Sequence, residues 1–118
     1  MLTFKQKIDR DTWRRGEGSN ASRERISLFN AISEAVTGKS AVVTSWHRAD
    51  NTWHNPENCE PSVVPCADFR TRIYDDDELK AVLSACIAAG LPAVSLYRGE
   101  PHQHIHCGDI MTLAYEVE

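Results

Sequence analysis

The chain twice places apolar residues at helical spacing, ends that pattern with a glycine and follows it with a short strand-like run. The first helix-spaced segment covers residues 19–38 and precedes the β-branched run 40–46. The second covers residues 75–90 and precedes the run 93–97. Apolar residues that recur near every 3.6 positions indicate amphipathic helices, and short β-branched runs indicate strands. The chain is therefore restricted to folds in which helices pack on a sheet.

The buried stripes of the two predicted helices are expected to form the core. A glycine closes each stripe, and three consecutive aspartates cap the start of the second helix. The stripe residues are Ile26, Phe29, Ile32, Ser33 and Val36 in the first helix, and Leu79, Val82, Leu83, Cys86 and Ile87 in the second.

The remaining segments complete an α+β domain. Further strands are predicted at residues 66–70, 104–107 and 110–117. Residues 1–18 are interpreted as an N-terminal arm or a short first helix, and residues 47–65 as a long functional loop. The prediction is a single domain over residues 19–118, with two main helices packed on a mostly antiparallel sheet.

Composition and charge exclude several classes of function. A net charge of -4 without a basic stripe argues against a nucleic-acid-binding protein. The sequence has no apolar run near the roughly 20 residues that span a bilayer and no signal-peptide pattern, so we expect a cytoplasmic protein without membrane contact. The four cysteines are expected to be reduced there. Arginines around Arg14 and Arg23 are interpreted as a solvated helix entry.

Three of the five histidines fall within the segment HQHIH at residues 102–106. Alternate residues of a strand share one face, so His102, His104 and His106 are expected to project together. Such a convergence suits a zinc ion, although isolated strand histidines more often face the core or the solvent.

Asp68 lies in the short apolar strand predicted at residues 66–70. A carboxylate in that setting is costly unless it has a partner. Two interpretations stay open: Asp68 binds a cation, together with the histidines, or it pairs with an arginine such as Arg48 or Arg70.

Three short motifs follow one another along the chain: TSWHR at residues 44–48, ADFRT at 67–71 and HIH at 104–106. They resemble the TSGYR segment, the end of the S-x-H-x-x-G-x-A-x-D motif and the terminal HIH segment of the zinc D-alanyl-D-alanine carboxypeptidase family. Small phage-encoded members of that family have about this length, and the resemblance covers roughly residues 24–108. It implies the small α+β fold that the family shares with the hedgehog signalling domain.

The resemblance also implies a peptidase site. Asp68 and His106 correspond to zinc ligands, and Arg48 to a residue that binds the substrate carboxylate or stabilises the oxyanion. A zinc ion would polarise the scissile carbonyl and lower the pKa of its bound water to about 7. Other residues of the motifs are expected to contact the ligand, namely Ser45, Trp46, Arg70 and His104; Trp46 has the alternative of filling the core.

Two positions depart from the family pattern. Pro61 stands where the motif places the first zinc histidine. Gln103 stands three residues before His106, where the family has an acidic general base. We expect His54 in the long loop to replace the missing zinc ligand. We expect Glu100, in the turn just before the HQHIH segment, to replace the general base.

Two functions remain for such a pocket. The first is zinc-dependent hydrolysis of peptidoglycan peptides, as in a phage lysis enzyme. The second is a non-catalytic role, in which the pocket binds or sequesters a small ligand or a partner protein, as a phage anti-defence or virion protein would. The departures at Pro61 and Gln103 favour the second, whereas the retained Arg48, Asp68 and His106 favour a pocket in use. Homo-oligomerisation is compatible with both.

Overall fold

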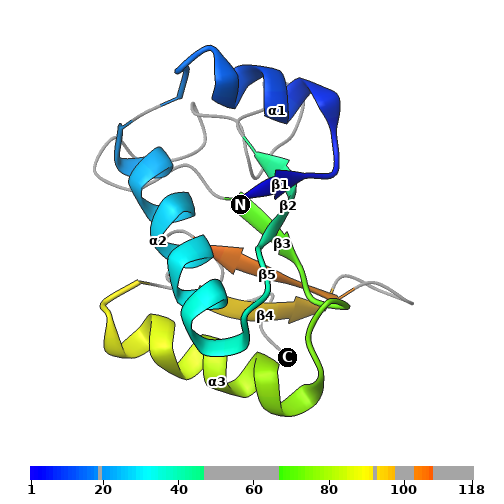
Figure 1. Ribbon diagram of the computed structural model, residues 1–118, viewed down its shortest axis with the longest axis vertical. Coiled ribbons are helices and arrows are strands. Elements are labelled where there is room, and N and C mark those ends of the chain that lie inside the picture. Colours follow the sequence, from blue (N-terminus) through cyan, green and yellow to red (C-terminus); the bar gives the residue numbers. More distant parts are fainter. Residues whose placement is uncertain (19, 47–66, 92, 98–102, 108–118) are drawn as a thin grey trace.

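One five-stranded sheet and three helices make up the described part of the chain (Figure 1). The computed structural model describes residues 1–18, 20–46, 67–91, 93–97 and 103–107. In chain order the elements are β1 (Thr3–Phe4), α1 (Lys7–Arg14), α2 (Asn20–Thr37), β2 (Val42–Trp46), β3 (Ala67–Arg70), α3 (Asp76–Ala88), β4 (Ala93–Tyr97) and β5 (Gln103–Cys107). The predicted α+β class is confirmed.

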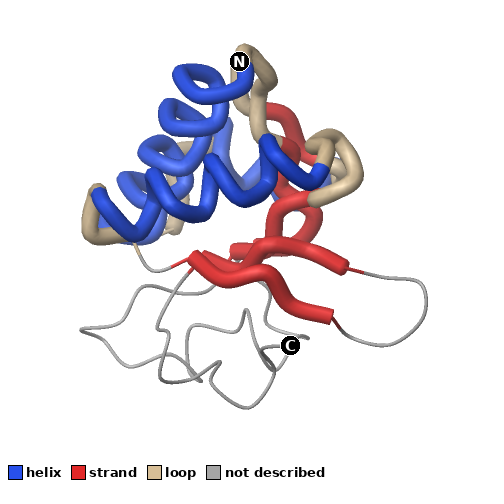
Figure 2. The backbone as a smooth tube through the Cα atoms, turned by 90° about the horizontal axis from the view of Figure 1, so that it is seen from below, coloured by secondary structure: helices blue, strands red, loops and turns tan. Residues whose placement is uncertain are grey.

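The sheet is mostly antiparallel, as the sequence predicts. Its strand order is β1-β2-β3-β5-β4, in which β1 runs parallel to β2 and the other neighbours are antiparallel. The helices lie together on one side of strands β3, β4 and β5 (Figure 2). The strand predicted at residues 110–117 and the loop predicted at residues 47–65 lie outside the described residues.

Helix α2 is held to the sheet by its buried stripe. Ile26 and Phe29 are fully buried, and the Phe29 ring stacks on that of Phe69 in β3 with 4.0 Å between centroids. Gly38 follows the helix with a φ of 75°, a left-handed conformation that glycine adopts without strain. Val36 was predicted to lie in the core but is 42% exposed, because the buried stripe ends one turn earlier, at Ser33.

Helix α3 begins with a capping box. The Asp75 carboxylate accepts a hydrogen bond from the Glu78 N–H at 2.8 Å, and the Glu78 carboxylate accepts one from the Asp75 N–H at 3.0 Å. Val82 and Cys86 are fully buried against the core. Ile87 is 66% exposed, so its predicted place in the core is wrong; one residue beyond Cys86, it lies about 100° further round the helix.

Residues 1–18, interpreted as an arm or a short first helix, contain both β1 and α1. The backbone N–H groups of Thr3 and Lys5 donate to the carbonyl oxygens of Ala41 and Val43, at 3.1 and 2.8 Å. These bonds add β1 to the edge of the sheet beside β2. The first residues of the chain are therefore part of the described fold.

An irregularity in β2 turns two of its side chains to the same side. The register pairs Val43 with Phe69, Ser45 with Asp68 and Trp46 with Ala67. Thr44 is thus an extra residue that forms a bulge. Strict alternation along the strand would place Val43 and Trp46 on opposite faces, but both are fully buried in the core.

Candidate functional site

Strands β3 and β5 bring together the motifs that contain the predicted metal ligands. Their antiparallel register pairs Asp68 with His106 and Arg70 with His104. Residues directly opposite each other in an antiparallel pair lie on the same face of the sheet, with Cβ atoms roughly 4.5–5.5 Å apart. The four positions therefore form a compact group.

This group lies on the sheet face that is turned away from the helices, which we call the strand face. Ala67 and Phe69 of β3 are buried in the core under the helices, so Asp68 and Arg70, at the alternate positions, belong to the opposite face. Figure 2 shows these strands with the helices on their other side. Two rows of paired positions cross the strand face: Ser45–Asp68–His106–Val94 and Arg70–His104–Leu96.

Asp68 is a buried carboxylate on the strand face. Only 9% of its surface is exposed, and the Thr44 hydroxyl donates to its backbone carbonyl at 3.2 Å. Burial of a charged carboxylate is costly unless a cation or hydrogen-bond donors compensate. Carboxylate and imidazole both bind zinc at roughly 2.0–2.2 Å, so the paired positions 68 and 106 fit two corners of a zinc site. An ion pair between Asp68 and an arginine would compensate the cost of burying the carboxylate equally well.

Gln103 occupies the other face of the sheet from the two histidine positions of β5. It pairs with Tyr97 and lies one residue before His104 and three before His106. Residues separated by an odd number of positions lie on opposite faces of a strand. An acidic residue at position 103 would therefore not act from the strand face in this fold.

Three predicted site residues, Arg48, His54 and Glu100, lie outside the part of the chain that the structure describes, as does Pro61. For His104 and His106 the backbone register is described and the side chains are not. Among the described side chains, no three His, Cys, Asp or Glu residues lie close enough together to hold a metal ion. The third ligand and the general base thus stay predictions.

Trp46 fills the core, which is one of the two places that the sequence left open for it. Its ring is fully buried, and its Nε1–H donates to the Ser22 hydroxyl of α2 at 2.7 Å. The Trp46 and Trp13 rings pack in an edge-to-face arrangement with 5.6 Å between centroids. Trp46 lies in the core because the bulge at Thr44 turns its side chain toward the helices. The pattern of residues in this strand gives no sign of the bulge. Ser45, which stays on the strand face, is half-buried.

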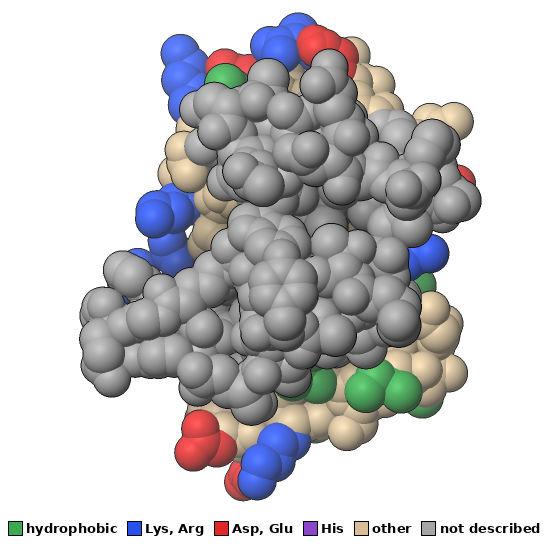
Figure 3. Space-filling model, turned by 180° about the vertical axis from the view of Figure 1, so that it is seen from behind, with side chains coloured by type: hydrophobic (Ala, Val, Ile, Leu, Met, Phe, Trp, Pro, Cys, Tyr) green, Lys and Arg blue, Asp and Glu red, His purple; other side chains and the backbone are tan. Residues whose placement is uncertain are grey.

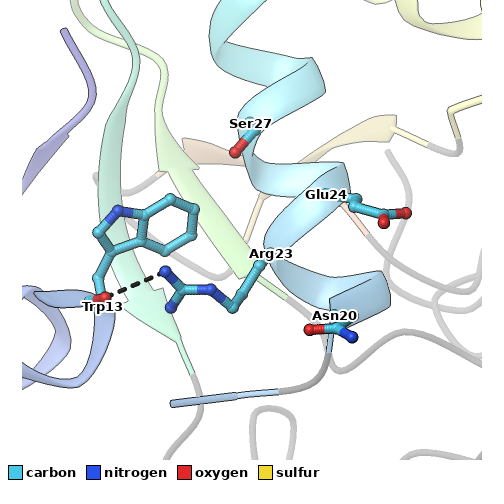
Figure 4. A pocket seen from close by; sticks show the side chains of 5 residues that line it. All are labelled: Trp13, Asn20, Arg23, Glu24 and Ser27. Carbon is cyan, nitrogen blue, oxygen red and sulfur yellow. Dashed lines mark hydrogen bonds between the residues drawn. The ribbon is translucent and has the colours of Figure 1, made fainter. Parts of the chain in front are cut away.

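A second feature, which sequence reasoning missed, is a hollow of about 340 Å³ between α1 and the first turns of α2 (Figure 4). It is lined by Trp13, Asn20, Arg23, Glu24 and Ser27. Arg23, interpreted as a solvated residue, instead donates to the carbonyl oxygens of Trp13 at 3.1 Å and Glu17 at 2.8 Å. The spacing of residues 20, 23, 24 and 27, which places them along one helix face, was the available signal.

The described surface carries charges of both signs. Lys, Arg, Asp and Glu side chains are interspersed around the margin of the rear view (Figure 3). Arg15 pairs with Glu17 at 2.7 Å, and this hydrogen bond raises the pKa of the Arg15 guanidinium. Burial raises the pKa of the Cys86 thiol to about 11, so it stays protonated at neutral pH and is no nucleophile. None of the described helices is long and apolar enough to cross a membrane.

Comparison of the chain with family models, with curated proteins and with solved structures found no match. The peptidase resemblance therefore depends on the three motifs and on the order in which they occur. The α+β class and the mostly antiparallel sheet are compatible with it.

Proposed function

We propose that this protein is a zinc-dependent peptidase of the D-alanyl-D-alanine carboxypeptidase type, acting on peptidoglycan peptides. The observation that carries the proposal is the cross-strand pairing of Asp68 with His106. It sets the positions of an aspartate and a histidine, two residue types that zinc prefers as ligands, directly opposite each other in the register of β3 and β5. The burial of Asp68 supports the same assignment, since a bound cation would offset the cost of desolvating its charge.

The row beside the two ligands supplies the proposed substrate contacts. Zinc bound by Asp68 and His106 would polarise the scissile carbonyl and lower the pKa of its bound water to about 7. Arg70 offers a planar guanidinium that can bind the terminal carboxylate of a peptide through two hydrogen bonds. His104, opposite Arg70, offers a further hydrogen bond to the peptide. Arg48 is the second arginine of the proposed site, where it would bind the substrate carboxylate or stabilise the oxyanion.

His54 and Glu100 complete the proposed site as third ligand and general base. A catalytic zinc keeps three protein ligands and one open position, so Asp68 and His106 require one more. Because Gln103 is on the opposite face from His106, the base comes from another segment. Glu100 lies between β4 and β5 in the sequence and is the acidic residue nearest to the start of β5 on its N-terminal side.

A non-catalytic pocket is the second candidate function. Pro61 and Gln103 replace a zinc ligand and an acid that hydrolysis in this family requires. A strand face that keeps Arg70 and His104 retains the means to bind an anionic small ligand or an acidic segment of a partner protein. In that case an arginine partner, and no metal, compensates the burial of Asp68.

The zinc content of protein purified without chelator tests the first proposal. The wild type is expected to hold about one zinc per chain, as a single catalytic site does. Asp68→Asn and His106→Ala are expected to lose that zinc, because each removes a proposed ligand. His104→Ala is the matched control: it changes the same strand one row away and should keep the metal while weakening peptide binding.

Release of D-alanine from a muropeptide that ends in D-Ala-D-Ala tests the hydrolysis itself. Activity is expected in the wild type with zinc and is expected to disappear in Asp68→Asn. Wild-type protein that neither retains zinc nor cleaves the muropeptide would remove the peptidase proposal and leave the binding role. Zinc retained in full by both Asp68→Asn and His106→Ala would show that the metal lies elsewhere.

A further inference from the structure

The strand face extends beyond the two rows that contain the proposed ligands, because β1 lies beside β2 at the edge of the sheet (Figure 1). The register of this parallel pair sets Phe4 opposite Val43. A hydrogen bond from the Lys5 N–H to the Val43 carbonyl oxygen, at 2.8 Å, continues the pairing beyond Phe4. Lys5 therefore lies beside Thr44, the bulge residue of β2.

Alternation along this extended segment turns the Lys5 side chain to the strand face. The Phe4 ring packs on Trp13 on the helix side of the sheet, with 5.8 Å between centroids. Neighbouring residues of a strand project to opposite faces, so Lys5 belongs to the face away from the helices. Its side chain is exposed, whereas Phe4 is partly buried. Lys5 thus adds a positive charge to the face that holds Asp68 and Arg70.

The bulge in β2 connects Lys5 with the proposed site. Ser45 is opposite Asp68 in the register, and the Thr44 hydroxyl donates to the Asp68 carbonyl at 3.2 Å. Bulges are frequent beside active sites, where they redirect side chains. Because β2 lies between β1 and β3, these positions follow one another across three neighbouring strands, with Lys5 at one end and Asp68 at the other.

The Lys5 ammonium is available to a ligand. Within the part of the chain that the structure describes, it takes part in no ion pair or hydrogen bond. By contrast, Lys39 is paired with Glu78 at 2.7 Å. A lysine carries its charge on a flexible four-carbon stem, which lets it reach an anionic group some distance from its own strand.

We propose that Lys5 binds a second carboxylate of the peptide substrate. This inference rests on the proposed function, in which Arg70 binds the terminal carboxylate. Lys5 and Arg70 are two strands apart, a separation of roughly 10 Å between backbones. Three residues of an extended peptide span roughly the same distance. The preferred substrate is therefore a peptide with an acidic residue three positions before its C-terminal D-alanine.

Two peptides that differ in one functional group test this preference: N-acetyl-Glu-Ala-D-Ala-D-Ala and its counterpart with glutamine in place of glutamate. The release of D-alanine by the wild type should show a KM about two- to fivefold lower for the acidic peptide, the effect of one exposed ion pair, with kcat unchanged. Lys5→Gln should remove that preference by raising KM for the acidic peptide alone. A structural role of Lys5 would instead change the KM of both peptides equally.

Lys7→Gln is the matched control, because it removes the same charge from an exposed side chain two residues further along the chain. It should keep the wild-type preference between the two peptides. Equal KM values in the wild type would overturn the proposal, and so would a preference that survives Lys5→Gln. An equal loss of preference in Lys7→Gln would show a general attraction between charges and no contact with Lys5.

Equilibrium binding of the same two peptides separates this inference from the peptidase proposal. Isothermal titration calorimetry measures it with zinc and with EDTA, independently of cleavage. Cleavage of both peptides with equal KM would overturn the role of Lys5 alone. A preference in binding that depends on Lys5, without cleavage, would overturn the peptidase and support Lys5. Binding of neither peptide would overturn both.

Discussion

The two faces of the sheet are specified by different physics, and one step along β3 passes from one to the other. Phe69 is fully buried on the helix side, where its ring stacks on Phe29 at 4.0 Å. Arg70, the next residue, lies on the strand face opposite His104. Packing in the core accounts for Phe69, whereas we attribute Arg70 to the binding of a ligand on the strand face. Stability should therefore depend on the helix side and function on the strand face.

Substitution of adjacent residues in β3 gives the largest test of that difference. Phe69→Ala removes a fully buried aromatic ring and its stacking on Phe29, so it should lower the free energy of unfolding by about 3–5 kcal/mol. Arg70→Ala should cost less than about 1 kcal/mol, as is usual away from the core. Urea unfolding followed by circular dichroism measures both. Equal losses would show that the strand face is as much a packing surface as the helix side.

Gly18 offers the second test, on the helix side near Trp46. Its φ is 91°, and a Cβ at this position would lie 2.6 Å from Cζ2 of the Trp46 ring. Gly18→Ala combines backbone strain with overpacking and should cost roughly 2–4 kcal/mol. Gly16→Ala is the matched control: its φ is 73° and nothing lies within 4 Å, so only the strain remains, about 1–2 kcal/mol. Similar thermal unfolding temperatures for the two variants would contradict the close approach to Trp46.

Local sequence patterns predicted the helices well, because helices are built from local spacing. The buried stripe of α2, its stop at Gly38 and the acidic cap of α3 were all readable from the chain. The exposure of Val36 and Ile87 was not, since apolar spacing marks a helix face and cannot say where along the helix the core ends.

Features that depend on contacts distant in sequence escaped prediction. The bulge at Thr44 moves Trp46 into the core, and Gly18 is required by the Trp46 ring that lies over it. The role of Arg23 depends on carbonyl groups at the end of α1. For the candidate site, the sequence predicted that a strand carrying Asp68 neighbours the histidines, and the register then supplied the pairing with His106.

A buried pair of hydroxyls gives a smaller test of the helix side. The Ser33 hydroxyl donates to the Lys39 carbonyl and accepts from the Tyr74 hydroxyl, both at 2.6 Å. Ser33→Ala removes both bonds and should cost about 2 kcal/mol, whereas Tyr74→Phe removes one and should cost about 1 kcal/mol. The double variant should cost less than the sum, because the two changes share one bond. Full additivity in urea unfolding would show that this bond contributes nothing.

The smallest expected effect is on the pH dependence of stability. It distinguishes the contribution of Glu78, on the helix side, from that of histidines on the strand face. Hydrogen bonds from Lys39, at 2.7 Å, and from the Asp75 N–H lower the pKa of the Glu78 carboxyl below its ordinary 4.5. A carboxyl whose pKa is lower in the folded state stabilises the fold above the unfolded-state pKa, and that contribution is lost as the pH falls through the folded-state pKa.

Glu78→Gln keeps the capping geometry and removes the charge, so it should flatten the stability profile only below about pH 4.5. Lys39→Gln should reduce the same acid-range slope, and the two changes should not add. Each variant should lower stability by a constant amount between roughly pH 5.5 and 7.5, the range in which histidines titrate, and should leave the slope of stability with pH unchanged there. Any slope that remains there in both variants then belongs to histidines, and its loss in His106→Ala but not in Glu78→Gln would assign it to the strand face. If the slope of stability with pH near neutrality disappears in Glu78→Gln, the contributions of the helix side and the strand face are not independent.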